Sequence, residues 1–226
     1  MQKLGKRRQA DVKQWDSDQA LPLPEAVAKI KSFKDTKFDQ SVDVCVHLGI
    51  DAKQADQMVR GSVSLPHGIG KTKRVVVFCG ADKVESAKQA GAVEAGGEEL
   101  VKKIEGGWLE FDVAVASPDL MRIVSKLGRM LGPKGLMPSP KSGTVTPNIV
   151  QAVTEYAAGK VEFRNDAGGN VHAIVGKKSF ANEQLVENAQ KFIDLVGKMK
   201  PAAVKGHYVK KVTLSGTMTP GVGVQV

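Results

Sequence analysis

The distribution of apolar residues changes twice along this chain, and that change restricts the fold more than any other feature. Between residues 42 and 48, apolar positions alternate with Asp43, Cys45 and His47, as in a strand with one buried face. Val75–Cys79 is apolar at every position, as in a strand buried on both faces. Alternation returns after Gly159. The sequence therefore predicts two kinds of sheet. The segment that forms the second kind is inserted between the segments that form the first.

The middle of the chain is predicted to alternate between strands and helices. The expected helices are 82–90, 98–104, 118–127 and 148–158, and the expected strands after 75–79 are 91–95 and 111–116. Residues 128–143 are rich in Gly and Pro and are predicted to form a loop. This order is typical of a small parallel, Rossmann-like α/β sheet.

The flanking segments are predicted to form an α+β domain. Pro24–Phe33 has apolar residues at helical spacing, and Met58–Leu65 has the composition of a strand. Asn182 is expected to cap a long helix that ends before Pro201. The last strand is expected over Tyr208–Ser215.

A turn signal follows Gly159. Val161–Arg164 and Val171–Val175 flank Asp166, Gly168 and Gly169, which predicts a hairpin of two antiparallel strands. Short strands of this kind resemble the N-terminal flank more than the middle of the chain.

The simplest domain model is discontinuous. Residues 1–69 and 160–226 would form one basic α+β domain, and residues 70–159 would form an inserted α/β domain. Gly68, Gly70 and Gly159 lie at the two crossings between them. Two adjacent crossings are expected to act as a hinge.

Charge is concentrated in the flanks. The chain has 226 residues and a net charge of +9. The flanks hold 21 Lys and Arg against 14 Asp and Glu, whereas the middle holds 12 against 10. A localised basic excess is typical of a protein that binds a polyanion.

The sequence gives no support for a membrane-spanning, secreted or disulfide-stabilised protein. No run of eighteen apolar residues exists, so a membrane partner is not expected, and the basic start lacks the apolar stretch of a secretory signal. Two distant cysteines do not suggest a disulfide framework, which fits a reducing cytoplasm.

No catalytic residue, cofactor or metal ligand is predicted. Gly70, Lys71 and Thr72 resemble the end of a phosphate-binding loop, but Leu65 stands where that motif needs a glycine. The four histidines and two cysteines share no metal-ligand spacing. A nucleotide-using α/β enzyme with a basic accessory domain, and a scaffold that contacts only proteins, remain as alternatives.

Candidate RNA contacts occur in both flanks. Lys37 would reach a phosphate and Phe38 would pack on a ribose or base, although a core position for Phe38 is an equal alternative. Ser215 and Thr217 are short hydroxyl side chains that suit a ribose 2′-hydroxyl. Met218 offers an apolar contact, or else lies in the core.

The remaining candidates are charged or glycine-rich. Arg164 and Asp166 lie at the predicted hairpin tip, where a turn explains the aspartate but not the arginine. Lys205 and Lys210 would contact phosphates, or else simply be solvated. The tail Gly221–Val226 is expected to be flexible enough to approach an RNA backbone closely.

Four segments carry a family resemblance. They are Val59–Gly68 (VRGSVSLPHG), Gly128–Pro138 (GRMLGPKGLMP), Val161–Asp166 (VEFRND) and Thr217–Met218. They occur in order across nearly the whole chain, which resembles the family of large-subunit ribosomal protein one, in its bacterial form. We expect Gly128–Pro138 to be a rigid loop.

The resemblance implies a basic two-segment domain, an inserted domain and a hinge. It implies binding to large-subunit rRNA at the mobile stalk, release of deacylated tRNA from the exit site, and repression of the protein's own mRNA. The Lys37–Phe38 and Thr217–Met218 pairs match its RNA-binding face. The family usually has glycine at position 219, whereas this chain has Thr219, so the local backbone there is in question. The chain is expected to be a monomer outside the ribosome.

Overall fold

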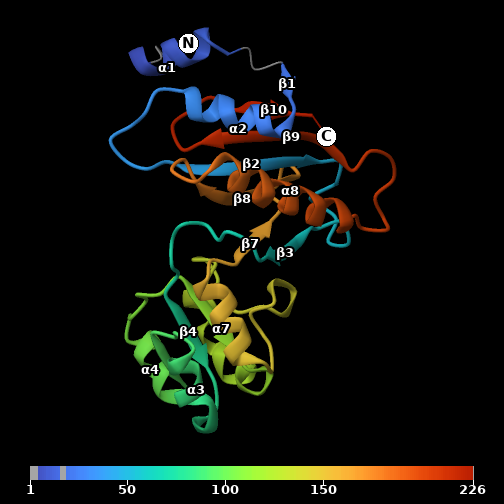
Figure 1. Cartoon of the computed structure of the whole chain (residues 1–226). Helices are drawn as coiled ribbons and strands as arrows, with labels where there is room; N and C mark the ends of the chain where they lie inside the picture. The colour runs from blue at the N-terminus through green and yellow to red at the C-terminus, as the bar shows by residue number, and fades with distance from the viewer. Residues whose placement is uncertain (1–4, 16–18, 226) are drawn as a thin grey trace. The chain divides into compact units, whose positions relative to one another are not determined.

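One interior strand of the largest sheet is paired on both sides with strands from the C-terminal part of the chain. In the computed structural model, which describes residues 5–15 and 19–225, β2 (Ser41–Leu48) lies between β8 (Asn170–Lys177) and β9 (Val209–Gly216). Both pairings are antiparallel. β10 (Val222–Val224) pairs with β9, and β1 (Ala20–Leu21) forms the far edge (Figure 1). The sheet therefore joins two distant segments of sequence.

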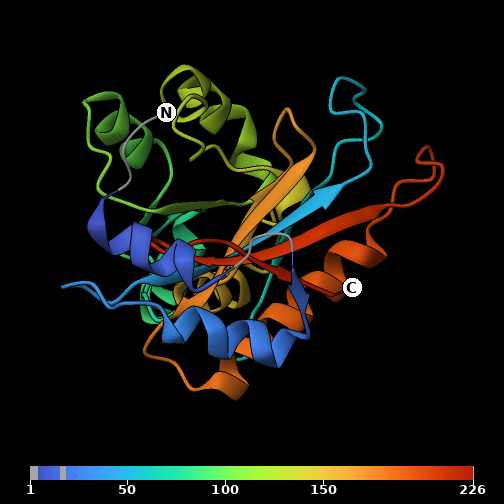
Figure 2. The same ribbon diagram turned by 90° about the horizontal axis from the view of Figure 1, so that it is seen from above.

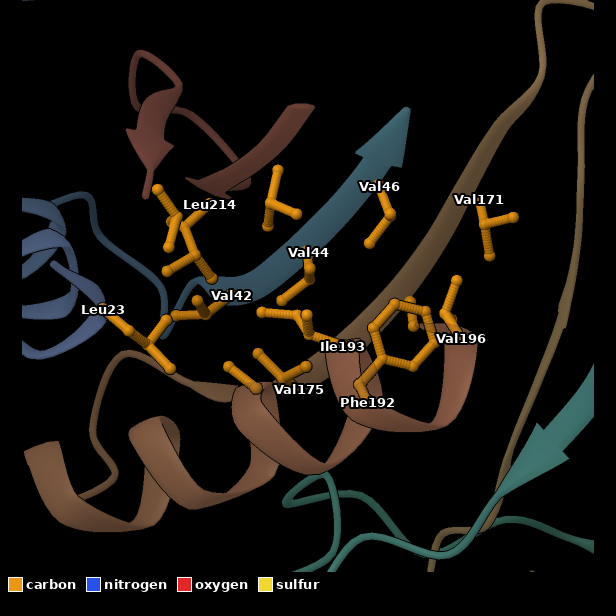
Figure 3. Packing of buried hydrophobic residues seen from close by; sticks show 14 of the residues in the cluster. Leu23, Val42, Val44, Val46, Val171, Val175, Phe192, Ile193, Val196 and Leu214 are labelled. Atoms are coloured by element: carbon orange, nitrogen blue, oxygen red, sulfur yellow. The ribbon is translucent and has the colours of Figure 1, made fainter. Parts of the chain in front are cut away.

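Two helices cover one face of this sheet. α2 (Leu23–Ser32) and α8 (Asn182–Lys198) lie side by side over it (Figures 1 and 2). Residues of β2 alternate strictly between buried and partly exposed, so the valines face the helices. Phe192, Ile193 and Val196 project from α8 toward those valines (Figure 3). The predicted amphipathic helices and half-buried strand are confirmed.

The chain divides into two compact units. The first consists of the segments that end at Gly70 and begin at Val161, and the second is Lys71–Lys160. Of the predicted segments 1–69 and 160–226, residues 1–4, 16–18 and 226 lie outside the described part. The first unit also contains α1 (Lys6–Lys13).

The predicted hairpin turn forms, but the strands on either side of it pair mainly with other strands. β7 (Val161–Arg164) pairs with β3 (Arg60–Val63) in a separate two-stranded sheet, and β8 pairs with β2. One isolated bridge, between Asn165 and Val171, links the two segments. Asn165 accounts for the difference, because it bonds Val59 in both directions and holds β7 beside β3.

The second unit contains a parallel sheet. β4 (Val75–Phe78) lies between β5 (Glu94–Gly96) and β6 (Val113–Ala116), and every β4 residue is buried. One face of β4 packs in a core with α7 (Ile149–Ala157), and the other in a core with α4 (Glu98–Glu105). A mixed α/β fold with a parallel sheet is thus confirmed. α3 (Val84–Gln89) follows a short 3-10 turn, η1 (Ala81–Lys83).

Local predictions in the second unit need two corrections. Residues 118–127 form η2 (Pro118–Leu120), α5 (Met121–Val124) and η3 (Ser125–Leu127) instead of one helix. The expected loop 128–143 begins as α6 (Gly128–Leu131), where Leu131 is buried in the core, and later contains η4 (Pro140–Ser142). Burial of Leu131 outweighs the glycines around it.

Two predictions in the first unit are also wrong. Asn182 is the first residue of α8 and not its cap; the cap is Ala181, whose N–H donates to the Gln184 side chain at 3.1 Å. Within the glycine-rich tail, Val222–Val224 forms the strand β10, with Val222 fully buried. Gly223 permits this, because a Cβ there would lie 2.8 Å from the Gln19 carbonyl oxygen.

A buried amide holds the first crossing between the units in place. Asn188 of α8 is fully buried, and its side chain donates to the carbonyl oxygens of Gly68 at 3.0 Å and Val175 at 2.8 Å. It also accepts a hydrogen bond from the His67 N–H at 3.2 Å. Gly68 has a positive φ of 62°, which suits this turn to glycine. One side chain therefore satisfies three backbone groups, namely the His67 N–H and the carbonyl oxygens of Gly68 and Val175.

We predict that Asn188→Ala lowers the free energy of unfolding by about 2–4 kcal/mol, because three backbone groups lose a buried partner. Urea denaturation measures the loss. Gln190→Ala, an exposed position on the same helix, should change stability by about 0.5 kcal/mol or less. Equal losses in the two variants would contradict the bonding role.

Candidate nucleic-acid interface

The turn after β9 is fixed to the start of β2. The Thr217 N–H donates to the Ser41 carbonyl oxygen at 3.0 Å, and the Ser41 N–H donates to Thr217 Oγ1 at 3.1 Å. The hydroxyl of Thr217 also lies 3.3 Å from the same carbonyl oxygen as a donor. A hydroxyl oxygen has two lone pairs, so Thr217 keeps one acceptor site for a ligand. The residue is exposed.

Met218 is exposed at a rigid point of this turn. Its side chain is 46% exposed, so the alternative core position is wrong. Its N–H donates to the Gln40 side chain at 3.0 Å, and Gln40 is itself 1% exposed. A buried amide thus holds the backbone while the apolar side chain points outward. This arrangement suits a contact with a flat apolar surface.

Thr219 is accommodated without backbone strain. Among the residues that the structure describes, every non-glycine residue has a negative φ. The Thr219 side chain is buried and accepts the Gly216 N–H at 2.8 Å, which closes the turn. The departure from the family's glycine therefore leaves an ordinary backbone and adds a hydrogen bond.

Lys37 and Phe38 lie on the same side of the first unit as this turn. Phe38 is 52% exposed, which excludes the alternative core position, and Lys37 is exposed. Both line an open hollow of about 610 Å³ together with Gln40 and Lys178. Since Gln40 also holds Met218, the hollow adjoins the Thr217–Met218 turn. Sequence positions 37–38 and 217–218 are therefore brought together.

A second group of predicted residues gathers at the opposite end of β2. Leu48 bonds the Gly169 carbonyl oxygen at 2.9 Å, which places the Asp166 turn there. The Lys210 side chain lies against Gly49, whose N–H bonds the Tyr208 carbonyl oxygen at 2.7 Å. Lys205 is exposed in the loop before β9. Seven residue steps at about 3.3 Å each separate the two groups by roughly 23 Å.

Ser215 lies between the groups, on the face of the sheet opposite α2 and α8. Its partner across the strands is Asp43 of β2. Burial raises the pKa of the Asp43 carboxyl, while His172 and Lys177 oppose that shift. A carboxyl beside Ser215 disfavours a phosphate at this position, so a hydroxyl contact suits it better.

The chain is similar to known ribosomal proteins. Residues 30–220 match the Ribosomal protein L1p/L10e family. A large ribosomal subunit protein uL1 from Nocardioides sp. is 52% identical over 97% of this chain and 91% of its own length. One from Cutibacterium acnes is 49% identical over 98% of this chain and 96% of its own length.

The chain belongs to the ribosomal protein L1p/L10e family. The resemblance expected from the four sequence segments is thereby confirmed, in the bacterial form. These relatives are named ribosomal proteins, and the family is structural and not enzymatic. The alternative of a nucleotide-using enzyme is therefore set aside.

Neither a metal site nor a membrane-spanning helix is found among the described residues. They contain no cluster of three or more His, Cys, Asp or Glu side chains placed to hold a metal ion. Within those same ranges, no helix has the length and apolar character needed to cross a membrane.

Sequence reasoning missed two residues that lie next to the candidate RNA contacts. Gln40 looks like an ordinary polar residue before a strand, yet it is buried and holds Met218. Arg60 lies directly opposite Arg164 across β3 and β7. No local spacing along the sequence links residues 60 and 164, so this cross-strand pairing could not be predicted.

Asp166 shapes its own turn. Its Oδ1 atom accepts the Asn170 N–H at 2.8 Å and the Gly168 N–H at 2.9 Å. These bonds lower the pKa of Asp166 from 3.8 to about 2, with the Asn170 backbone N–H as the largest cause. The carboxylate therefore positions the turn that follows β7, whose last residue is Arg164, and much of its hydrogen-bonding capacity is already used.

We predict that this turn resists acid. A folded-state pKa below the ordinary 3.8 means that the carboxylate stabilises the turn above that value and loses this effect as pH falls toward about 2. NMR amide shifts of Gly168 and Asn170 should stay at their neutral-pH positions down to about pH 3. Asp166→Asn should move them at neutral pH, whereas Asp194→Asn on α8 should not. A midpoint near 4 would refute the lowered pKa.

Proposed function

We propose that the chain is a structural constituent of the large ribosomal subunit in the cytoplasm, and that its first unit binds large-subunit rRNA. Family membership supports the first part. The observation that carries the second is the Thr217–Met218 turn: exposed side chains on a backbone held by Ser41 and Gln40, beside an exposed Phe38. Such rigidity lowers the entropy lost on binding.

The proposed contact spans both ends of β2. Lys37 and Phe38 take a phosphate and an adjoining ribose or base, while Thr217 and Ser215 contact 2′-hydroxyls. Some 23 Å away, Arg164, Lys205 and Lys210 take phosphates, with Asp166 setting the loop. Two groups at a fixed separation recognise the shape of a folded RNA, because a disordered strand would have to be held extended between them.

Further roles rest on the family resemblance alone. They are release of deacylated tRNA from the exit site by way of the second unit, and repression of the chain's own mRNA through an RNA fold similar to the rRNA site. We also propose that the chain is a monomer outside the ribosome. The rRNA and the mRNA would both use the Thr217–Met218 turn of the first unit, so one substitution in this turn should weaken the binding of both.

We propose that the two units, residues 1–69 with 160–226 and residues 70–159, are domains joined by a hinge. The glycines first expected at this hinge are anchored. Gly68 is bonded by Asn188, and Ile69 is buried in the core of the first unit. A Cβ at Gly70 would lie 2.9 Å from the Phe180 ring, so its backbone packs closely there.

The second crossing is anchored in the other unit. The Gly159 N–H bonds the Tyr156 carbonyl oxygen at 3.1 Å, which continues α7. Lys160 bonds Glu155 through its side chain at 2.7 Å and accepts the Lys73 side chain on its carbonyl oxygen at 2.7 Å. The pivots are therefore proposed at Lys71–Thr72 and at the junction between residues 160 and 161.

The rRNA contact is tested by Thr217→Val. Loss of the hydroxyl should weaken binding by about 1–3 kcal/mol, because a ribose hydroxyl and the Ser41 N–H both lose a partner. Filter binding to deproteinised large-subunit rRNA from Cutibacterium acnes measures the change. Thr154→Val, at an exposed position on α7, is the matched control and should bind like the unmodified chain. Unchanged affinity for Thr217→Val would contradict the proposed contact.

Lys210→Ala should behave differently in the same assay. Removing one phosphate contact should reduce the slope of log affinity against log salt by about 1, while Thr217→Val should leave that slope unchanged. Lys191→Ala, on the outer side of α8, controls for the loss of one charge. An unaltered slope for Lys210→Ala would count against a phosphate at this position.

The hinge proposal predicts where the backbone moves. NMR relaxation of backbone amides should show larger amplitude at Lys71 and Thr72 than at Gly68 and Gly70, because the glycines are held by Asn188 and the Phe180 ring. Motion centred on Gly68 and Gly70 would return the pivot to the glycines.

A further inference from the structure

The N-terminal helix lies before the family match, yet it is fixed to the turn that we propose binds RNA. The match begins at residue 30, whereas α1 ends at Lys13. Arg7, Asp11 and Trp15 recur every four residues and form one side of this segment. Asp11 is 2% exposed and Trp15 is 8% exposed. This side is packed against the rest of the first unit, whereas Arg8, Gln9, Ala10, Val12 and Lys13 are exposed.

Three contacts hold that side in place. Arg7 Nη2 donates to the Met218 carbonyl oxygen at 2.9 Å. Trp15 Nε1 donates to the Gly221 carbonyl oxygen at 3.1 Å, and Asp11 accepts the Lys34 N–H at 3.3 Å. Two of the three partners belong to the segment that carries Met218. The helix therefore braces the segment that carries Met218.

The sequence of α1 gives it little stability of its own. It has eight residues, and its first turn holds Lys6, Arg7 and Arg8 with no acidic residue. Helices this short are marginal in water, and cations at the amino end oppose the helix dipole. The helical structure of α1 therefore depends on its contacts with the rest of the first unit. The hydrogen bonds of Arg7 and Trp15 are among those contacts.

Both peptide groups that flank the Met218 Cα are hydrogen-bonded to side chains. Gln40 accepts its N–H at 3.0 Å, and Arg7 donates to its carbonyl oxygen at 2.9 Å. With both polar groups of the backbone bonded, the exposed side chain is presented in a restricted orientation. We propose that Arg7 is a positioning residue for RNA recognition: it fixes the Met218 backbone so that the methionine side chain meets the RNA. This inference rests on the proposed rRNA binding.

The test uses the full chain and deproteinised large-subunit rRNA from Cutibacterium acnes. Arg7→Ala should weaken binding roughly three- to tenfold, the range for one lost hydrogen bond. Arg8→Ala removes the same charge from the same helix without the Met218 bond, and should change affinity less than Arg7→Ala. Arg7→Lys keeps a charged donor and should retain most of the affinity.

A double-mutant cycle separates positioning from charge. In a Met218→Ala background, Arg7→Ala should have little further effect, because the side chain that it positions is gone. Arg8→Ala should have the same effect in both backgrounds. If Arg7→Ala and Arg8→Ala weaken binding equally, and both add to Met218→Ala, α1 supplies only charge and the proposal is overturned.

A measurement on the free protein tests whether Arg7 orients the Met218 side chain. The Met218 methyl resonance of 13C-labelled protein should shift or broaden in Arg7→Ala and remain in place in Arg8→Ala. An unmoved resonance in Arg7→Ala would overturn the positioning role. If the unmodified chain fails to bind rRNA, the proposed function fails, while the methyl resonance still tells whether Arg7 orients Met218.

Discussion

The pairing of β2 with strands from the opposite end of the chain is the constraint on which the first unit depends. β2 has hydrogen-bonded partners on both edges, β8 and β9, and its valines form the centre of the core under α2 and α8. Removing either partner would expose one edge of the strand. The N-terminal and C-terminal segments of the first unit therefore cannot form this sheet separately. The chain has to pass from the first unit into the second and back again between them.

The same pairing builds the proposed interface. The first residue of β2, Ser41, is bonded to Thr217, and the residue before it holds Met218 through a buried amide. Exposed groups are thereby carried on a backbone whose polar groups are satisfied. The cost of ordering the turn is met during folding and not during binding, which favours recognition of a rigid, preformed RNA surface.

Local patterns in the sequence predicted the elements that depend on neighbouring residues. The alternation in β2, the apolar run of β4 and the inner face of α8 all follow from spacing along one strand or helix. The choice of strand partner did not follow, because β7 joins β3 through bonds between Asn165 and Val59, 106 residues apart. The bracing of Met218 by Gln40 and Arg7 joins residues 178 and 211 positions apart, so spacing carries no signal of it. Exposed site residues were named from chemistry and motif, while the buried residues that orient them required the structure.

The interleaved sheet has a consequence for how the chain is made. During synthesis, β2 emerges long before residues 170–177 and 209–216, so its valines have no strand to pair with for most of translation. The second unit draws all its strands from one continuous stretch and is complete well before the carboxyl end appears. Nascent chains would then carry a finished inner unit and an unfinished outer one, and a chain truncated before β9 would leave an apolar strand edge open to aggregation.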